Sequence, residues 1–186
     1  MNLQKMFEMQ KALDDRIIKE KGLEGQDLLP NLILALQVEL AECANEWRGF
    51  KHWSNDREPR TKHPLEVSPN GAFRRGGNPL LEEYVDCLHF ILSIGNRLGW
   101  NDTDTIDDVV AQHLISEKGF DTAKTFSCLL SIAYGFHFSN VEKRTYISLF
   151  TTFFELGSKL GFKWEQIEAA YMDKNAVNHQ RQQEGY

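Results

Sequence analysis

Five carboxylates stand at helical spacing within two apolar segments of the sequence. Glu39, Glu42 and Glu46 are separated by three and four residues, and Glu83 and Asp86 repeat the three-residue spacing. On α-helices each set projects from one face, where neighbouring carboxylates repel one another. If the two faces meet inside a helical bundle, they form an oxygen-rich cavity that suits a hard divalent cation. The spacing therefore predicts an Mg²⁺ or Mn²⁺ site, with two solvated acidic faces as the alternative.

Histidine and cysteine do not cluster around these acids, which argues against a soft-metal or redox centre. His89, one turn after Asp86, is the only obvious neighbour. A lone histidine on an apolar helix is more often a packing residue than a ligand, so we assign it no metal, although it could touch a substrate. Cys43, Cys87 and Cys128 lie far apart without C-x-x-C spacing and are predicted to be buried free thiols.

Apolar periodicity and helix-breaking residues indicate helices along most of the chain, and strand-like alternation is almost absent. The expected helices run from Leu3 to before Gly22, Leu32 to Phe50, Pro79 to about Arg97, Thr103 to Glu117, Thr122 to Phe138, Val141 to Leu160 and Trp164 to about Asn178. The fold class is therefore predicted to be all-α, a helical bundle whose metal site lies between two central helices.

The segment from His52 to Asn78 differs from the rest because it is rich in proline, glycine and basic residues. Long loops inside compact domains are uncommon and are often functional. We expect a flexible loop at 54–78, from which Lys62, Arg74 and Arg75 could reach a charged ligand. A solvated insertion is the alternative.

The composition is that of a globular protein, with 186 residues, 41% hydrophobic and 26% charged. A formal net charge of −6 argues against a general nucleic-acid binder, but a cation held by carboxylates would still allow a phosphorylated ligand. The sequence lacks a signal-peptide core and an apolar run of membrane-spanning length. We therefore expect a cytoplasmic protein without nucleic-acid or membrane partners.

Four stretches of the sequence carry further motifs. The two acidic segments read E-L-A-E-C-A-N-E-W-R-G-F-K-H-W from Glu39 to Trp53 and L-E-E-Y-V-D-C-L-H-F-I-L-S from Leu81 to Ser93. The N-terminal segment reads F-E-M-Q-K-A-L-D from Phe7 to Asp14, and the C-terminal one reads K-N-A-V-N-H-Q-R-Q-Q-E-G-Y from Lys174 to Tyr186. In this order they resemble the motifs of the dimeric all-α dUTPases. These enzymes belong to the all-α NTP pyrophosphohydrolases, which include MazG-type proteins and dCTPases and share an E-x-x-E…E-x-x-D metal motif.

The resemblance implies a single all-α nucleotide pyrophosphohydrolase domain over residues 1–186. Its expected activity is that of a dUTP diphosphatase, which hydrolyses dUTP, and also dUDP, to dUMP by Mg²⁺-assisted attack of water on the α-phosphorus. The family uses more than one Mg²⁺, and the matching positions make Glu39, Glu42, Glu83 and Asp86 the ligands. Glu39 or Glu46 would act as general base, and the motifs do not separate the two.

The resemblance also implies a set of substrate contacts. Gln10 and Asp14 would line the base pocket, and the amide of Gln10 can both donate and accept hydrogen bonds as the uracil edge requires. The remaining contacts would be Trp53 near uracil, His89 and Phe90 near the sugar, and Lys51, Lys174, Asn178 and Arg181 at phosphate or sugar, with Tyr186 closing over the site. The alternatives are core packing for Trp53 and Phe90 and a solvated polar tail for the C-terminal residues.

Two other functions remain open at this point. The nearer one is a related pyrophosphohydrolase acting on dCTP or on several NTPs, and the distant one is a helical interaction module without enzymatic activity. The resemblance implies a homodimer as well. Five phenylalanines could supply its interface or could fill the monomer core, namely Phe136, Phe138, Phe150, Phe153 and Phe154.

Overall fold

The computed structural model describes residues 2–68, 71–74, 76–115, 119, 121–138 and 141–185. This part of the chain contains seven helices: α1 (Leu3–Glu20), α2 (Leu29–Trp47), α3 (Pro79–Leu98), α4 (Thr103–Ile115), α5 (Thr122–Gly135), α6 (Lys143–Lys159) and α7 (Trp164–Gln183). The predicted all-α fold is confirmed.

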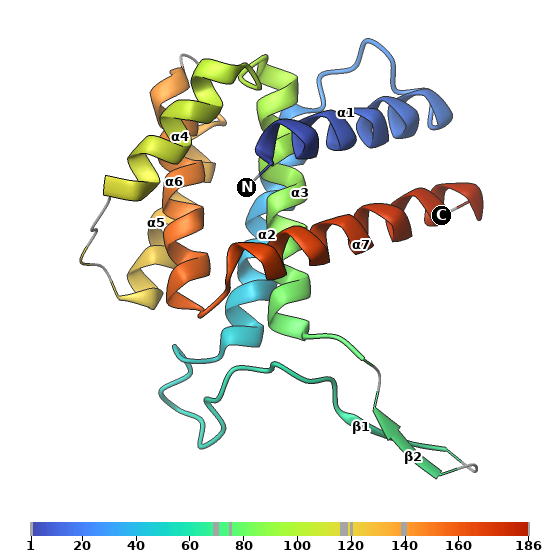
Figure 1. The fold of residues 1–186 in the computed structure, drawn as a ribbon, viewed down its shortest axis with the longest axis vertical. Coiled ribbons are helices and arrows are strands. Elements are labelled where there is room, and N and C mark those ends of the chain that lie inside the picture. The colour runs from blue at the N-terminus through green and yellow to red at the C-terminus, as the bar shows by residue number, and fades with distance from the viewer. Residues whose placement is uncertain are drawn as a thin grey trace.

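Helix α3 occupies the centre of the bundle, where it contacts α1, α2, α6 and α7. Helices α2 and α3 run side by side along most of their length (Figure 1). Helices α1 and α7 cross α3 and also contact each other, while α5 packs against α2 and α6, and α4 packs against α6. The two helices that carry the acidic motifs are therefore the central pair, as predicted.

Local sequence explains why α3 begins and ends where it does. The side chain of Asn78 accepts a hydrogen bond from the backbone N–H of Leu81, and Pro79 occupies the first helical position. Gly99 ends the helix in the left-handed conformation, with φ of 70°. Between these ends nearly every residue from Tyr84 to Gly95 is buried, because helices pack on several sides of α3.

Aromatic side chains of α6 form much of the core against α3. The ring of Tyr84 stacks on Phe153 at a centroid distance of 4.1 Å, and its hydroxyl donates to the backbone oxygen of Phe153 at 3.0 Å. Phe136, Phe150, Phe153 and Phe154 are buried, whereas Phe138 is 59% exposed. Of the two alternatives for the five phenylalanines, core packing is correct for four, and the homodimer stays a prediction.

The segment between α2 and α3, predicted as a loop at 54–78 and with almost no strand-like alternation, contains a short hairpin. Strands β1 (Leu65–Ser68) and β2 (Gly71–Arg74) pair in antiparallel register, with Leu65 opposite Arg74. This hairpin projects away from the helices (Figure 1). A hairpin this short carries little alternation, which explains why the sequence pattern did not indicate it.

The predicted helix boundaries also differ at several ends. Helix α7 continues to Gln183 instead of ending near Asn178, since Arg16 of α1 donates to the backbone oxygen of His179 at 3.1 Å and holds the last turns. Helix α2 begins at Leu29 and ends before Arg48, which adopts a left-handed conformation with φ of 64°. The buried guanidinium of Arg48 donates to the backbone oxygen of Asp56 at 2.6 Å and so fastens the following loop.

Helices α5 and α6 are each slightly shorter than predicted. The expected end of the fourth helix at Glu117 lies outside the described residues. The prediction of buried free thiols is confirmed for Cys43 and Cys87, whereas Cys128 is free and half-buried. Among the helices that the structure describes, none has the length and apolar character needed to cross a membrane.

Candidate active site

Three of the predicted metal ligands converge between the two central helices. One carboxylate oxygen from each of Glu39 on α2 and Glu83 and Asp86 on α3 lies within 4.8 Å of the others, and all three side chains are half-buried. Glu42 is exposed and lies outside this group. We call Glu39, Glu83 and Asp86 the carboxylate group. Three oxygen ligands at this separation suit a divalent cation.

Burial and mutual repulsion disfavour the ionised form of the carboxylate group. The pKa of Glu39 rises to about 7, first through burial and then through the charges of Asp86 and Glu42. The pKa of Glu83 also rises to about 7, again through burial and then through Asp86 and Glu42. Burial raises the pKa of Asp86 as well, against the opposing effect of Lys174. A divalent cation would relieve this repulsion, so the donor set fits a metal.

Helix α7 brings cations to the carboxylate group. The ammonium of Lys174 donates to Asp86 Oδ2 at 2.5 Å. Arg181, two turns further along α7, is close enough for its charge to lower the pKa of Asp86. Glu46, in contrast, is engaged elsewhere, because its Oε1 accepts a hydrogen bond from Arg60 Nη1 at 3.0 Å.

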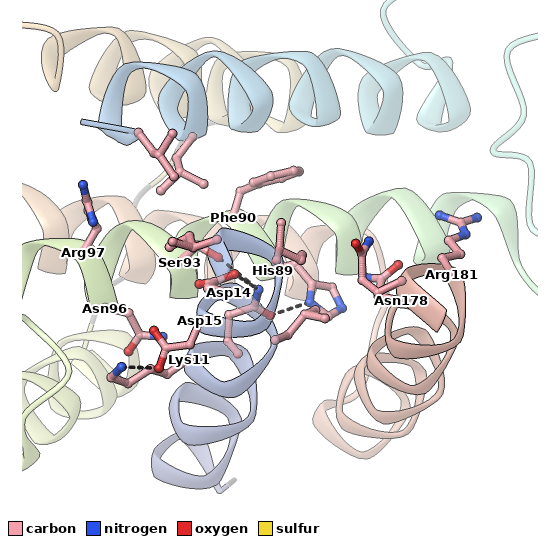
Figure 2. Close-up of a pocket in the computed structure, with 17 residues that line it drawn as sticks. Lys11, Asp14, Asp15, His89, Phe90, Ser93, Asn96, Arg97, Asn178 and Arg181 are labelled. Atoms are coloured by element: carbon pink, nitrogen blue, oxygen red, sulfur yellow. Dashed lines mark hydrogen bonds and ion pairs between the residues drawn. The ribbon is translucent and has the colours of Figure 1, made fainter. Parts of the chain in front are cut away.

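A cavity of about 520 Å³ opens beside the carboxylate group, one turn further along α3. Side chains from α1, α3 and α7 converge on it, as Figure 2 shows. We call this cavity the helical pocket. It brings together six of the predicted substrate-binding residues, Gln10, Asp14, His89, Phe90, Asn178 and Arg181.

Comparison with known protein families agrees with this geometry. The model of a family described as dUTPase matches residues 2–67 and 72–186, which is nearly the whole chain. The chain belongs to the dimeric all-α dUTPase family. A search of curated proteins found no match. Membership places the chain among nucleotide pyrophosphohydrolases and implies a nucleotide substrate.

In this dUTPase family member, every hydrogen-bonding position of the Gln10 amide is occupied by the protein itself. Its Nε2 donates to Asp14 Oδ1 at 2.9 Å and to Ser93 Oγ at 3.0 Å. Its Oε1 lies 2.6 Å from His89 Nδ1 and 3.2 Å from the Tyr171 hydroxyl, whose single hydrogen is shared with the backbone oxygen of Met6 at 3.0 Å. Because a primary amide offers two donors and two acceptor positions, Gln10 is saturated. Gln10 therefore holds Asp14, Ser93 and His89 in the pocket wall. To contact a base, it would have to give up one of these hydrogen bonds.

The network around Gln10 also assigns the tautomer of His89. Burial lowers the pKa of His89 to about 3, with a further lowering from the charge of Lys174, so the imidazole is neutral. Since Nδ1 faces the carbonyl oxygen of Gln10, Nδ1 carries the proton and Nε2 is an acceptor. Within the described part of the chain, His89 Nε2 is buried and has no hydrogen-bond partner.

Asp14 is the acidic group of the same wall. Burial raises its pKa from 3.8 to about 6, although hydrogen bonds from Ser93 and Gln10 act in the opposite direction. A partly exposed carboxylate that the fold holds in a desolvated position at the edge of a pocket is typical of a functional site. Asp14 is thus an ionisable group in the lining of the helical pocket that hydrogen-bonds Ser93.

The other predicted contacts lie away from the helical pocket or outside the described residues. Lys51 and Trp53 follow α2, where Lys51 Nζ lies 5.6 Å from the ring centroid of Phe50 and Trp53 is 68% exposed. Neither lines the helical pocket. Tyr186, like Arg75, lies outside the described residues, and the side chain of Arg74 does as well.

Sequence reasoning missed two residues that the fold brings to the site. Ser93 lies two turns after Asp86, and extending the acidic face of α3 by the helical period would have found it. Arg60 lies in the loop after α2, and no local signal indicated that it would bond Glu46.

Proposed function

We propose that this protein hydrolyses dUTP, and also dUDP, to dUMP with Mg²⁺ as cofactor. The observation that carries the proposal is the position of the carboxylate group, which lies one helical turn along α3 from a pocket of nucleoside size. This arrangement suits a ligand with phosphates at one end and a base at the other. Family membership supports the same reaction.

Glu39, Glu83 and Asp86 would hold Mg²⁺, and Glu42 would join them from the exposed side. Bound Mg²⁺ supplies neutralisation of phosphate charge and polarisation of a phosphoryl oxygen. Lys174 and Arg181 would then bind phosphate oxygens, since Lys174 already lies at the edge of the carboxylate group. In this proposal the cations of α7 orient the phosphates against α3.

The helical pocket would bind the nucleoside. His89 Nε2 is a buried acceptor, so it would receive a hydrogen bond from a sugar hydroxyl. Phe90 would form an apolar wall at C2′, where an added hydroxyl would lack a partner. Asp14 and Asn178, which line the pocket, would offer polar groups to the base in place of the Gln10 amide.

Between the two candidates for general base, the geometry favours Glu46. Glu39 belongs to the carboxylate group, where a cation would occupy its lone pairs. Glu46 lies outside that group, and Arg60 fixes its orientation through Oε1. We therefore propose that Glu46 takes the proton from the attacking water.

The test is an assay of the purified protein with each dNTP, UTP and dUDP, in Mg²⁺ and in EDTA. Conversion of dUTP to dUMP and pyrophosphate that requires Mg²⁺ and exceeds turnover of dCTP and UTP is expected. Selective turnover of dCTP, or broad turnover, would move the assignment to a related pyrophosphohydrolase. A folded protein that hydrolyses no nucleotide would overturn the enzymatic function and favour an interaction module.

Two matched variants separate ligand from base. Glu39→Gln should weaken Mg²⁺ binding and abolish turnover, whereas Glu46→Gln should bind Mg²⁺ as the wild type does and lose turnover by about 10²–10⁴-fold. Equal loss of Mg²⁺ affinity in both variants would contradict the assignment of Glu46.

We also propose a homodimer, which family membership supports. Leu34 and Val38 lie one turn apart on α2 and are 59% and 46% exposed. Because they are neighbours on one helix face, they offer an apolar surface that a second copy of the chain would cover. Light scattering on the purified protein should give twice the mass of the chain, and Leu34→Glu should lower it.

A further inference from the structure

Helices α1 and α7 form two walls of the helical pocket, and both project beyond α3 on the same side of the bundle (Figure 1). Helix α7 contributes Asn178 and, three and four residues later, Arg181 and Gln182, so the three share one helix face. Helix α1 contributes Gln10 and Asp14 among its lining residues. The position of α7 relative to α1 therefore determines whether both sets of side chains can contact one ligand.

Hydrogen bonds join α1 to α7 at two places. The inner connection is formed by the buried hydroxyl of Tyr171, which lies 3.0 Å from the backbone oxygen of Met6. The outer connection is formed by Arg16, whose Nη1 donates to the backbone oxygen of His179 at 3.1 Å and lies 3.4 Å from Nδ1 of the same residue. At about 1.5 Å per residue, the outer connection lies roughly 15 Å further along α1 and roughly 12 Å further along α7. It therefore acts on the last turns of α7, which the inner connection does not reach.

The side chain of Arg16 is held by its own helix while it bonds α7. Its Nε donates to Glu20 Oε1 at 2.7 Å, one turn further along α1, and the side chain is 27% exposed. A guanidinium has five N–H donors, so the bonds to Glu20 and His179 do not compete. The oxygen of His179 has two lone pairs, so it can accept from Arg16 and also within α7. Arg16 thus connects the two walls without disturbing either helix.

The last turns of α7 carry part of the pocket although they are weakly buried. The final carbonyl groups of a helix have no partner within it, and helix ends fray. Gln180, Arg181 and Gln183 are exposed, whereas Tyr171 and Asn175, earlier in α7, are buried. When only a fraction of the molecules has the binding-competent conformation, the apparent affinity for the ligand falls by that fraction. A bond that holds these turns in place would therefore strengthen ligand binding.

We propose that Arg16 is a positioning residue of the helical pocket, which holds the end of α7 so that Asn178, Arg181 and Gln182 face the nucleotide. This inference rests on the proposed function for the identity of the ligand. The carboxylate group lies on α2 and α3 and does not depend on the outer connection. Lys174, which bonds Asp86, lies one turn from the inner connection. Loss of Arg16 therefore weakens nucleotide binding and leaves Mg²⁺ binding unchanged.

The first test compares Arg16→Gln with the wild type by calorimetric titration with dUMP in Mg²⁺, by titration with Mg²⁺ alone, and by steady-state hydrolysis of dUTP. Lys19→Gln is the matched control, since it removes the same charge from an exposed residue of α1. We expect Arg16→Gln to weaken dUMP binding by about 3- to 10-fold and to raise KM for dUTP by a similar factor. Its kcat should change by less than about twofold, because the lost positioning acts on binding. Mg²⁺ affinity, and every property of the control, should match the wild type.

The second test measures amide hydrogen exchange without any ligand. In Arg16→Gln, the amides of residues 180–183 should exchange about 3- to 10-fold faster than in the wild type, because the end of α7 frays more often. The amides of α3 and the whole Lys19→Gln protein should exchange at the wild-type rate. Equal rates at the end of α7 in wild type and Arg16→Gln would overturn the inference.

Failure of the inference can be told apart from failure of the proposed function. If the wild type hydrolyses dUTP and Arg16→Gln binds dUMP as tightly, the inference is wrong and the proposed function stands. If Arg16→Gln weakens Mg²⁺ and dUMP binding equally, the inference is also wrong, because Arg16 would then support the whole fold. If the wild type neither hydrolyses a nucleotide nor binds dUMP, the proposed function fails. Hydrogen exchange then still decides whether Arg16 holds the end of α7.

Discussion

Replacement of Asp14 with asparagine should make the protein more stable at neutral and alkaline pH. Burial raises the pKa of Asp14 from 3.8 to about 6, so the folded state holds the ionised carboxylate at a free-energy cost. Since the folded pKa lies above the unfolded one, the cost is nearly absent below pH 4, grows between pH 4 and 6, and is complete above pH 6. The asparagine variant escapes this cost because its amide is neutral.

The magnitude follows from the two pKa values. Their difference, at about 1.36 kcal/mol per pH unit, corresponds to roughly 3 kcal/mol as an upper bound. In the wild type, Gln10 Nε2 donates to Asp14 Oδ1 at 2.9 Å, and the oxygen of an asparagine can accept the same bond. The amide hydrogens of the asparagine, however, need new partners at the edge of the pocket. We therefore expect a gain of about 1–2 kcal/mol at pH 8, equivalent to a Tm higher by about 2–8 °C.

The assay is urea unfolding of wild type and Asp14→Asn at pH 4.5 and pH 8. The gain at pH 4.5 should be smaller than the gain at pH 8 by about 2 kcal/mol, because about two thirds of the cost arises between these values. Asp108→Asn serves as the control, since Asp108 is exposed on α4 and does not line the helical pocket. A gain that is the same at both pH values, or an Asp14 variant that is less stable at pH 8, would refute the desolvation argument. Lower affinity for dUMP in the more stable variant would link the cost to function.

Three further predictions concern the metal, the core and the pocket wall. Affinity for Mg²⁺, measured by calorimetry, should rise as pH increases from 6 to 8, because Glu39 and Glu83 lose protons near pH 7; a flat profile would contradict this. Gly157→Ala should destabilise the fold by about 1–3 kcal/mol in thermal unfolding, since its new Cβ would lie 2.5 Å from Tyr84 Oη. Gln10→Leu should cost about 2–4 kcal/mol in urea unfolding because it removes all four hydrogen bonds of a saturated amide; a change below 1 kcal/mol would mean that these bonds are replaced by water.

Local signals in the sequence were sufficient for most of the fold. Asn78 and Pro79 mark the start of α3 and Gly99 its end, and the apolar face between them fixes which side is buried. The predictions failed where neighbours in space override local preference. Arg48 ends α2 in a left-handed conformation because its guanidinium bonds Asp56, and α7 continues past Asn178 because α1 supports it.

The candidate site was also predictable from local sequence only in part. The spacing of Glu39, Glu83 and Asp86 predicted that the carboxylates lie on helix faces. They meet because α2 packs against α3. The family motifs pointed to His89 and Asn178 at the helical pocket, where the structure has them. The motifs could not show that His89 is neutral or that its Nε2 is buried without a partner in the described part of the chain.

The sequence by itself determined the helices, the acidic faces and the family, because each depends on residues within a few turns of one another or on motifs read in order. Only the tertiary structure decided that Gln10 is saturated, that Lys174 bonds Asp86, and that the loop basic residues border Glu83. The partners of Gln10 on α3 and α7 lie 79 to 161 residues away along the chain. Contacts over such separations depend on how helices cross, and no short-range pattern encodes that crossing.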